Sequence, residues 1–316
     1  MMKTAYVFPG QGSQYVGMGA ALAEMDPLAC ELFDEADAAL GFSLRAIFLE
    51  GTSDQLRLTY YTQPAILTVS VIAYRLAVKH GFPIPDYALG HSLGEYSALV
   101  AAGVLTFSDA VRLVHKRGHF MDEAVPAGIG AMAAVLGADL LALASLCREI
   151  ANELSEVVEI ANENCPGQVV VSGHKAAVSR LVERAKEAGA KRAIPLDVSG
   201  PFHSSLMAPA GARLAAELAG VELRKAAFPI VANVSAEPLT EPDDIRLALV
   251  QQISKPVLFE AGIRQLLGQS VQTFVEMGPG SVLSGLIKKI DRQATTQRIE
   301  DDGTFTQAKA AILGVS

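Results

Sequence analysis

Short apolar runs alternate along the chain with longer segments in which apolar residues recur every three to four positions. The short runs have the length of buried β-strands, and they lie at residues 5–8, 87–89, 169–171, 192–196, 230–232 and 273–276. The longer segments predict amphipathic helices at residues 62–80, 94–102, 108–123, 175–188, 207–218 and 281–290. This alternation is typical of an α/β protein whose sheet is mainly parallel.

Two stretches of small residues with a proline interrupt the pattern, at residues 124–128 and 199–201. Between them the expected order is strand, helix, strand, strand, helix, strand. This βαββαβ order predicts a ferredoxin-like α+β subdomain at residues 127–199. We expect it to be inserted into a larger catalytic core formed by residues 1–126 and 200–316.

The composition narrows the class of protein. Half of the 316 residues are hydrophobic and only 19% are charged, which excludes a disordered or coiled-coil chain. The net charge of −8 disfavours nucleic acid as a partner. The beginning of the chain has no signal-peptide pattern and no apolar window is long enough to span a membrane, so we expect a cytoplasmic protein without a membrane partner. Cys30, Cys147 and Cys165 form no CxxC pair, which predicts reduced thiols and no metal site.

Residues Gly90-His91-Ser92-Leu93-Gly94 have the form GxSxG, between a predicted strand and a predicted helix. In a nucleophile elbow the glycines let the strand and the helix approach closely, and the serine stands at the helix N-terminus, where N–H groups favour developing negative charge. An ordinary Gly-Ser turn is the alternative interpretation.

A second loop, Phe8-Pro9-Gly10-Gln11-Gly12, follows the first predicted strand. It lacks the lysine of a phosphate loop and the third glycine of a dinucleotide-binding loop, so nucleotide binding is disfavoured. The Gln11 N–H could be the second donor of an oxyanion hole, and a simple connecting turn is the alternative.

His203 follows Ser92 along the chain, in the order found in elbow enzymes, and is either the base or a structural histidine. His115 and His119 lie four residues apart on one predicted helix, without the glutamate of an HExxH motif, and are interpreted as a solvated pair.

Arg117 lies on the apolar stripe of the predicted helix at 108–123. A buried guanidinium needs an anionic partner. That partner is either a carboxylate of the protein or the carboxylate of a substrate, held by two hydrogen bonds.

These motifs together resemble the malonyl-CoA:acyl-carrier-protein transacylase family. The residues that carry the resemblance run in the family's order from 8 to 280, and they are Phe8-Pro9-Gly10-Gln11-Gly12-Ser13-Gln14, Gly90 to Ala98, Arg117, Asn162 to Gln168, Gly200 to Ser204 and Glu276 to Gly280. The resemblance implies a hydrolase-like α/β core that carries the small ferredoxin-like subdomain.

The resemblance also implies a role for each site residue. Ser92 would be the nucleophile and His203 its base. Gln11 and Leu93 would supply the oxyanion N–H groups. The remaining site residues would bind substrate: Arg117 through the malonate carboxylate, Phe202 as a ring that leaves little space for an α-methyl group, and Gln252, although the adjacent Gln251 fits nearly as well. A main-chain carbonyl near Gln252, rather than the Asp197 carboxylate, would accept the His203 Nδ1 proton.

The implied reaction is ping-pong transfer of malonyl from malonyl-CoA to the phosphopantetheine thiol of acyl carrier protein, without a metal or a redox cofactor. It would supply fatty acid or polyketide synthesis. An esterase or thioesterase, and a carrier-binding module without catalysis, are the alternatives; Arg117 and the Gln11 loop disfavour the first, and the intact Ser92 and His203 disfavour the second. Two basic clusters could bind an acidic carrier protein: Lys288, Lys289 and Arg292, or Lys191 and Arg192.

Overall fold

The computed structural model describes residues 3–126 and 128–314, and within them the strands form two sheets. The larger sheet has the strand order β10-β9-β1-β2-β7-β8. Its neighbouring strands are parallel, except that β8 runs antiparallel to β7. In sheet order the strands are β10 (Thr295–Ile299), β9 (Val271–Met277), β1 (Lys3–Phe8), β2 (Tyr87–Gly90), β7 (Ile230–Val231) and β8 (Pro238–Leu239).

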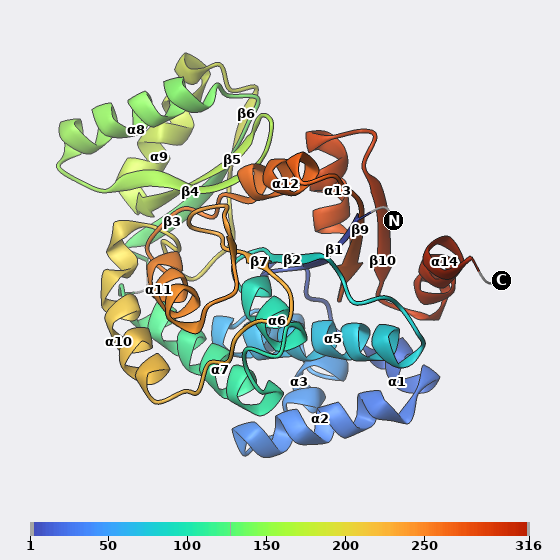
Figure 1. Cartoon of the computed structure of the whole chain (residues 1–316). Coiled ribbons are helices and arrows are strands. Elements are labelled where there is room, and N and C mark those ends of the chain that lie inside the picture. Colours follow the sequence, from blue (N-terminus) through green and yellow to red (C-terminus); the bar gives the residue numbers. More distant parts are fainter. Residues whose placement is uncertain (1–2, 127, 315–316) are drawn as a thin grey trace.

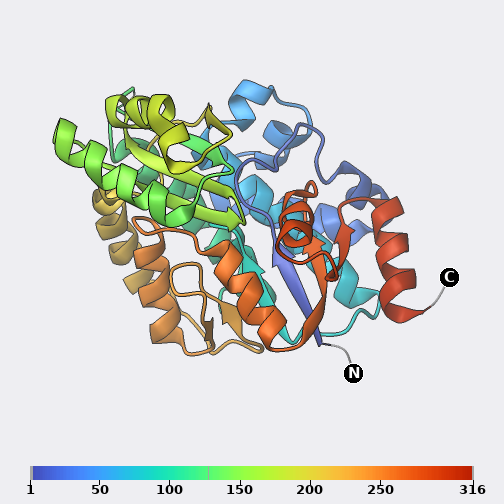
Figure 2. The ribbon, with the colours of Figure 1, turned by 90° about the horizontal axis from the view of Figure 1, so that it is seen from above.

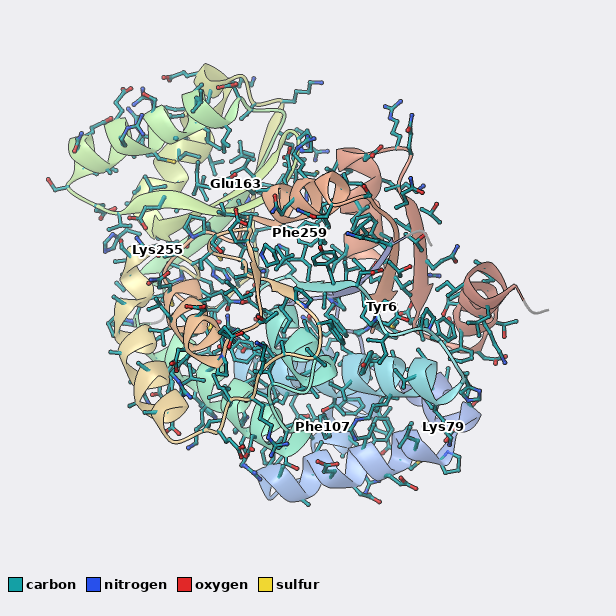
Figure 3. The ribbon with its side chains drawn as sticks, in the orientation of Figure 1. Tyr6, Lys79, Phe107, Glu163, Lys255 and Phe259 are labelled. Carbon is teal, nitrogen blue, oxygen red and sulfur yellow. The ribbon has the colours of Figure 1, made fainter. Side chains whose placement is uncertain are left out.

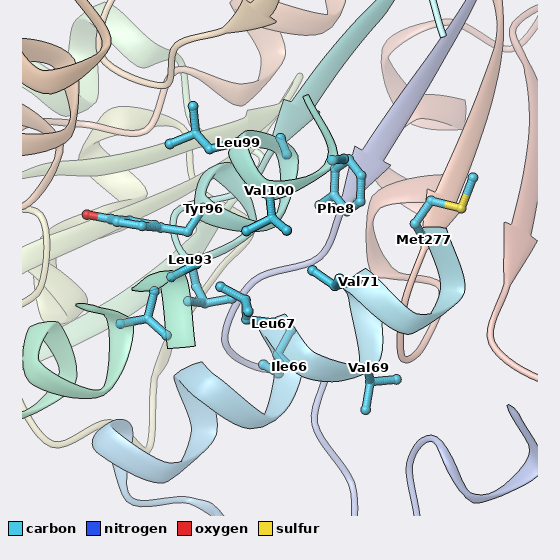
Figure 4. Packing of buried hydrophobic residues seen from close by; sticks show 14 of the residues in the cluster. Phe8, Ile66, Leu67, Val69, Val71, Leu93, Tyr96, Leu99, Val100 and Met277 are labelled. Atoms are coloured by element: carbon cyan, nitrogen blue, oxygen red, sulfur yellow. The ribbon is translucent and has the colours of Figure 1, made fainter. Parts of the chain in front are cut away.

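Helices cover both faces of this sheet (Figure 1). Successive side chains of β1 point to opposite faces. Tyr6 and Phe8 pack with α5 (Thr59–Lys79) and α6 (Gly94–Ala101) on one face, whereas Ala5 and Val7 pack with α12 (Phe259–Gly268) and α13 (Val282–Ile290) on the other. Figure 4 shows Phe8 beside the apolar residues of α5 and α6. A parallel strand buried on both faces has a continuous apolar sequence, which explains why residues 5–8 were recognisable.

The smaller sheet belongs to a separate unit, seen in green at the upper left of Figure 1. Its strand order is β4-β5-β3-β6, and all neighbours are antiparallel. The helices α8 (Leu140–Leu154) and α9 (Lys175–Arg184) pack on it, and the strands are β3 (Gly130–Leu136), β4 (Val158–Cys165), β5 (Gln168–His174) and β6 (Arg192–Pro195). This is the ferredoxin-like arrangement, so the expected fold class is confirmed. Residue 127, where the unit was expected to begin, lies outside the described residues, and the boundaries stay a prediction.

The remaining helices lie mostly in segments to which the sequence pattern assigned nothing. They are α1 (Ala20–Met25), α2 (Pro27–Leu40), α3 (Leu44–Leu49), α4 (Ser53–Leu56), α7 (Phe107–Glu123), the 3-10 turns Ala185–Ala188 and Ser205–Met207, α10 (Ala208–Ala219), α11 (Pro242–Gln252) and α14 (Asp302–Leu313). Among the described helices, none combines the length and the apolar character needed to cross a membrane.

The beginning of α5 corrects the interpretation of the histidine pair. Pro64 lies inside this helix and has no N–H to donate to the Tyr60 carbonyl. The ring of His115 on α7 takes that place, with 2.7 Å between its Nδ1 and the carbonyl oxygen, and His119 stacks on the Tyr60 ring with centroids 4.1 Å apart. Both histidines are half-buried, so the prediction of a solvated pair is wrong.

The two units lie next to each other (Figure 2), and main-chain hydrogen bonds join them. Asn162 of β4 forms an isolated parallel bridge with Val257, and the Val257 N–H and carbonyl bond to Ala161 and Glu163 at 2.9 Å each. Figure 3 labels Glu163 and Phe259 at this junction, where β4 runs beside α12. The small unit lies next to the carboxyl ends of β1 and β2, because the loops after these strands line a cavity together with Ala134 and Val170 of the small unit.

Candidate active site

The carboxyl ends of β1 and β2 lie side by side in the larger sheet. Their last residues, Phe8 and Gly90, are paired, and the His91 N–H donates a 3.0 Å hydrogen bond to the Phe8 carbonyl. The Gln11 loop and the Ser92 turn therefore leave the sheet next to each other. Ligand sites of open parallel sheets form outside the carboxyl ends of their strands.

Ser92 occupies the sharp turn between β2 and α6. Its φ of 49° is a left-handed conformation that costs a residue with a side chain about 1–3 kcal/mol. Close packing requires the flanking glycines: a Cβ on Gly90 would lie 1.8 Å from the Gly94 carbonyl carbon, and a Cβ on Gly94 would lie 2.0 Å from the Phe8 carbonyl oxygen. The strand, turn and helix expected of a nucleophile elbow are thus present.

Ser92 and His203 form a hydrogen-bonded pair. Ser92 Oγ lies 2.8 Å from His203 Nε2, and His203 Nδ1 lies 2.8 Å from the main-chain oxygen of Gln252. A carbonyl only accepts, so Nδ1 carries the proton and Nε2 is free to accept the Ser92 hydroxyl proton. Asp197 is not part of this arrangement, because its carboxylate is exposed and pairs with Arg57. The dyad oriented by a main-chain carbonyl is the geometry that the family resemblance implied.

Burial keeps the His203 ring neutral. Only 5% of the residue is exposed, and this desolvation, with the charge of Arg117 nearby, lowers the pKa of His203 to about 3. The ring is therefore in the form that accepts a proton across the neutral pH range.

Arg117 on α7 is completely buried beside Ser92. One terminal nitrogen donates to Gln63 Oε1 at 2.8 Å, and the other donates to Gln252 Oε1 at 2.9 Å and to Ser92 Oγ at 3.1 Å. No carboxylate of the described residues lies within 4.0 Å of the guanidinium, and its Nε has no hydrogen-bond partner among them. The sequence left two partners open for Arg117, a carboxylate of the protein or one of a substrate. Within residues 3–126 and 128–314, no carboxylate of the protein forms an ion pair with it.

The structure distinguishes the two adjacent glutamines at the end of α11. Gln252 is completely buried against Arg117, whereas Gln251 is exposed to solvent. Successive residues of a helix point about 100° apart, so only one of the two can face the core. Gln252, the residue that the family resemblance favoured, is the one that does.

The two candidate oxyanion donors both reach the cavity in front of Ser92. Leu93 is the N-cap residue of α6, and Gln11 follows β1 in the neighbouring loop. Among the hydrogen bonds of the described residues, neither main-chain N–H has an acceptor. Free donors at a helix N-terminus are suited to an oxyanion.

A cavity of about 110 Å³ brings the predicted residues together. Six of the seven line it, and the seventh, Gln252, bonds to Arg117; the six are Gln11, Ser92, Leu93, Arg117, Phe202 and His203. It adjoins a larger cavity of about 440 Å³ that opens between the core and the small unit. The two share the lining residues Gln11, His91, Asn162, Leu196 and Val198.

Sequence analysis missed two polar residues that support this site. Gln63 is a buried residue of α5, where its long polar side chain stands beside the apolar run 64–67, and that contrast was a signal in the sequence. Asn233 follows β7, and its Oδ1 accepts the Ser92 N–H at 2.7 Å. Nothing local in the sequence distinguishes Asn233 from other loop asparagines.

An α/β core that presents a serine on such a turn, bonded to a histidine, defines a class of acyl-transferring enzymes and hydrolases. The family model described as "Acyl transferase domain" matches residues 5–308. The malonyl CoA-acyl carrier protein transacylase of Bacillus subtilis is 51% identical over 308 residues, which are 98% of this chain and 96% of the relative.

Solved structures agree with this match. The malonyl CoA-acyl carrier protein transacylase of Coxiella burnetii has a TM-score of 0.96 and 41% identity, and 98% of each chain is covered. A malonyl-transacylase solved in complex with its type II PKS acyl-carrier protein has a TM-score of 0.95 and 42% identity, with 99% of this chain and 100% of the other covered. The chain therefore belongs to the malonyl CoA-acyl carrier protein transacylase family.

Proposed function

We propose that this protein transfers a malonyl group from malonyl-CoA to the phosphopantetheine thiol of acyl carrier protein through an acyl-enzyme on Ser92. The observation that carries the proposal is the buried Arg117 guanidinium, 3.1 Å from Ser92 Oγ and without a carboxylate of the described residues within 4.0 Å. A desolvated cation next to a nucleophile favours an acyl group that brings its own carboxylate.

In the first half-reaction, Ser92 Oγ attacks the thioester carbon while His203 Nε2 accepts the hydroxyl proton. The negative charge on the carbonyl oxygen is stabilised by the N–H groups of Gln11 and Leu93. When the C–S bond breaks, His203 returns the proton to the CoA sulfur, which leaves malonyl bound to Ser92 through an ester. No step of this scheme calls for a metal or a redox cofactor.

In the second half-reaction the carrier thiol attacks the Ser92 ester, with His203 as its base, and the proton passes to Ser92 Oγ as the C–O bond breaks. The two cavities, which share the lining residue Asn162 among others, would hold the long pantetheine arm common to both thiols. A single channel therefore serves both substrates, which suits a ping-pong order.

The carrier protein would bind where α13 borders the larger cavity. Leu283 and Leu286 line that cavity, and Lys289 on the same helix donates a 3.0 Å hydrogen bond to Gln168, another lining residue. This position favours the cluster of Lys288, Lys289 and Arg292 over Lys191 and Arg192 as the surface for an acidic carrier. The product would supply extender units for fatty acid or polyketide synthesis, in the cytoplasm, where cysteine thiols such as the exposed Cys30 stay reduced.

Intact mass spectrometry after mixing with malonyl-CoA tests this proposal. The protein should gain the mass of one malonyl group, which maps to Ser92 and disappears when holo-acyl carrier protein is added. The Ser92→Ala variant should fold and gain no mass. An adduct that maps to a cysteine, or release of free malonate at the rate of transfer, would refute the proposal.

A further inference from the structure

The side-chain amide of Gln252 is held in one orientation. Its Nε2 lies 2.8 Å from Glu95 Oε2 and 3.0 Å from the Ser92 carbonyl oxygen, and its Oε1 accepts from Arg117 at 2.9 Å. Rotating the amide by 180° would place its oxygen against the Glu95 carboxylate and its N–H groups against the guanidinium. As a hydrogen-bond acceptor facing the amide, Glu95 Oε2 therefore keeps the Gln252 oxygen pointed at Arg117.

The same Glu95 oxygen holds a second part of the site. It accepts the main-chain N–H of Asn233 at 3.0 Å, and the Asn233 side chain in turn bonds to the elbow on both sides of His91. Asn233 Oδ1 accepts the Ser92 N–H at 2.7 Å, and its Nδ2 donates to the Gly90 carbonyl at 2.6 Å. One carboxylate oxygen thus fixes the segment that clamps the strained turn.

Glu95 lies three residues after the nucleophile on α6, and 2% of it is exposed. The two groups that it anchors come from segments 138 and 157 residues further along the chain. The side chain of Gln252 links Glu95 to Arg117. The main-chain oxygen of Gln252 accepts a hydrogen bond from His203. Neither half-reaction uses Glu95 directly.

We propose that Glu95 is a positioning residue for malonyl transfer, which holds Gln252 and Asn233 and so aims the Arg117 guanidinium at the substrate carboxylate. The inference deepens the proposed function and rests on it. It predicts a specific defect: loss of Glu95 should harm acyl groups that carry a carboxylate more than acyl groups that do not.

The environment of Glu95 is consistent with this role. Burial raises the pKa of Glu95 to about 7, and the hydrogen bonds from Asn233 and Gln252, with the charge of Arg117, oppose the rise. Arg117 and Glu95 are thus a buried guanidinium and a buried carboxyl group separated by one amide. A carboxyl group that only stabilised the fold would not need to be linked to the substrate-binding cation through a single amide.

The test compares E95A, which removes both acceptor oxygens, with E95Q, which keeps one oxygen where Oε2 lies. Rates of Ser92 acylation are measured with malonyl-CoA and with acetyl-CoA, and the readout is the ratio of the two. Loss of a charge-assisted hydrogen bond supports an expected fall of at least about tenfold in this ratio for E95A. For E95Q the ratio should stay within about threefold of the parent value, since a single charge-free acceptor can still meet both donors.

Glu276→Gln is the matched control. Glu276 is also a completely buried glutamate that accepts main-chain N–H groups, from Leu283 and Ser284 at the start of α13, and it touches none of the groups around Arg117. The ratio of the malonyl-CoA to the acetyl-CoA acylation rate of this variant should equal that of the parent protein. If E95A does not fold, E95D replaces it, because a carboxylate shortened by one methylene cannot reach both donors, and it should lower the ratio.

The outcomes separate this inference from the proposed function. If the parent protein is not acylated by malonyl-CoA, the proposed function fails. If the parent is acylated and folded E95A retains the parent ratio, or if E95A and E95Q lower the ratio equally, the positioning role is refuted while the proposed function stands.

Discussion

Replacing Arg117 by alanine should convert the protein from a malonyl-selective to an unselective acyltransferase. The guanidinium is fully desolvated, and three of its hydrogen bonds are made to Gln63, Gln252 and Ser92. Its Nε has no partner among the described residues, so donors remain for a substrate carboxylate. The variant removes the charge that would meet that carboxylate and leaves the Ser92–His203 pair in place.

The magnitude follows from the hydrogen bonds between the guanidinium and the substrate carboxylate, which alanine cannot make. A hydrogen bond between charged groups contributes about 1.5–3 kcal/mol, and a carboxylate gripped by two of them about 3–6 kcal/mol. Each 1.4 kcal/mol is a factor of ten, so kcat/KM for malonyl-CoA should fall by roughly 10²–10⁴. Acetyl-CoA has no carboxylate, and its kcat/KM should stay level or rise.

The assay is transfer from each thioester to holo-acyl carrier protein, measured with the thermal midpoint of each variant. Arg112→Ala is the control, because Arg112 lies on the same helix but is half-exposed and pairs with Asp109. Unchanged malonyl transfer by Arg117→Ala would refute the carboxylate role. Equal losses for both thioesters, with a lowered melting temperature, would instead assign Arg117 to the stability of the fold.

Further predictions concern the base, the elbow and the carrier protein. His203→Ala should lower the transfer rate by about 10²–10⁴, whereas Asp197→Asn should keep it within about tenfold of the parent rate. Equal losses at unchanged melting temperature would show that Asp197 is the third member of a catalytic triad. Because burial lowers the pKa of His203 from 6.5 to about 3, the rate of Ser92 acylation should not drop by half as the pH is lowered through 6.5. The folded protein binds fewer protons at this ring than the unfolded chain, so its contribution to the free energy of unfolding is full above pH 6.5 and is lost toward pH 3; a pH titration of unfolding that is identical for His203→Ala would contradict this. Gly94→Ala should lower the free energy of unfolding in denaturant by ~1–3 kcal/mol or more. Gly285→Ala, whose Cβ meets nothing within 4 Å, should leave it unchanged or raise it. Lys289→Glu should raise KM for the carrier protein and leave KM for malonyl-CoA unchanged; an unaltered carrier KM would remove α13 as the docking helix.

Features fixed by local geometry were predictable from the sequence. The glycines at 90 and 94 surround Ser92 because main-chain atoms approach within a few ångströms there, and that constraint is written into five consecutive residues. The buried strands and the βαββαβ unit follow from periodicity, since each strand and helix buries a regular face. The burial of Arg117 followed from its place on an apolar stripe.

Features fixed by tertiary contacts were not predictable from the sequence. Asn233 and Gln63 enter the site only because β7 and α5 meet β2 and α7 in space. The half-burial of His115 depends on a carbonyl that Pro64 leaves free on another helix. Short helices such as α3 and α4 contain too few turns to show a period, so the pattern did not reveal them.

The distance along the chain between the interacting residues has a consequence during synthesis on the ribosome. Gln252, which orients His203 and bonds to Arg117, is 160 residues beyond Ser92. At ~5–20 residues per second, translation of that interval takes roughly 8–32 s. Until Gln252 is made, the nascent chain presents Ser92 without its oriented base and, once residue 117 is made, the Arg117 guanidinium without one of its two amide partners. We therefore expect an unfinished chain to form no acyl-enzyme, and activity to begin only when the segment of Gln252 has folded against Ser92 and Arg117.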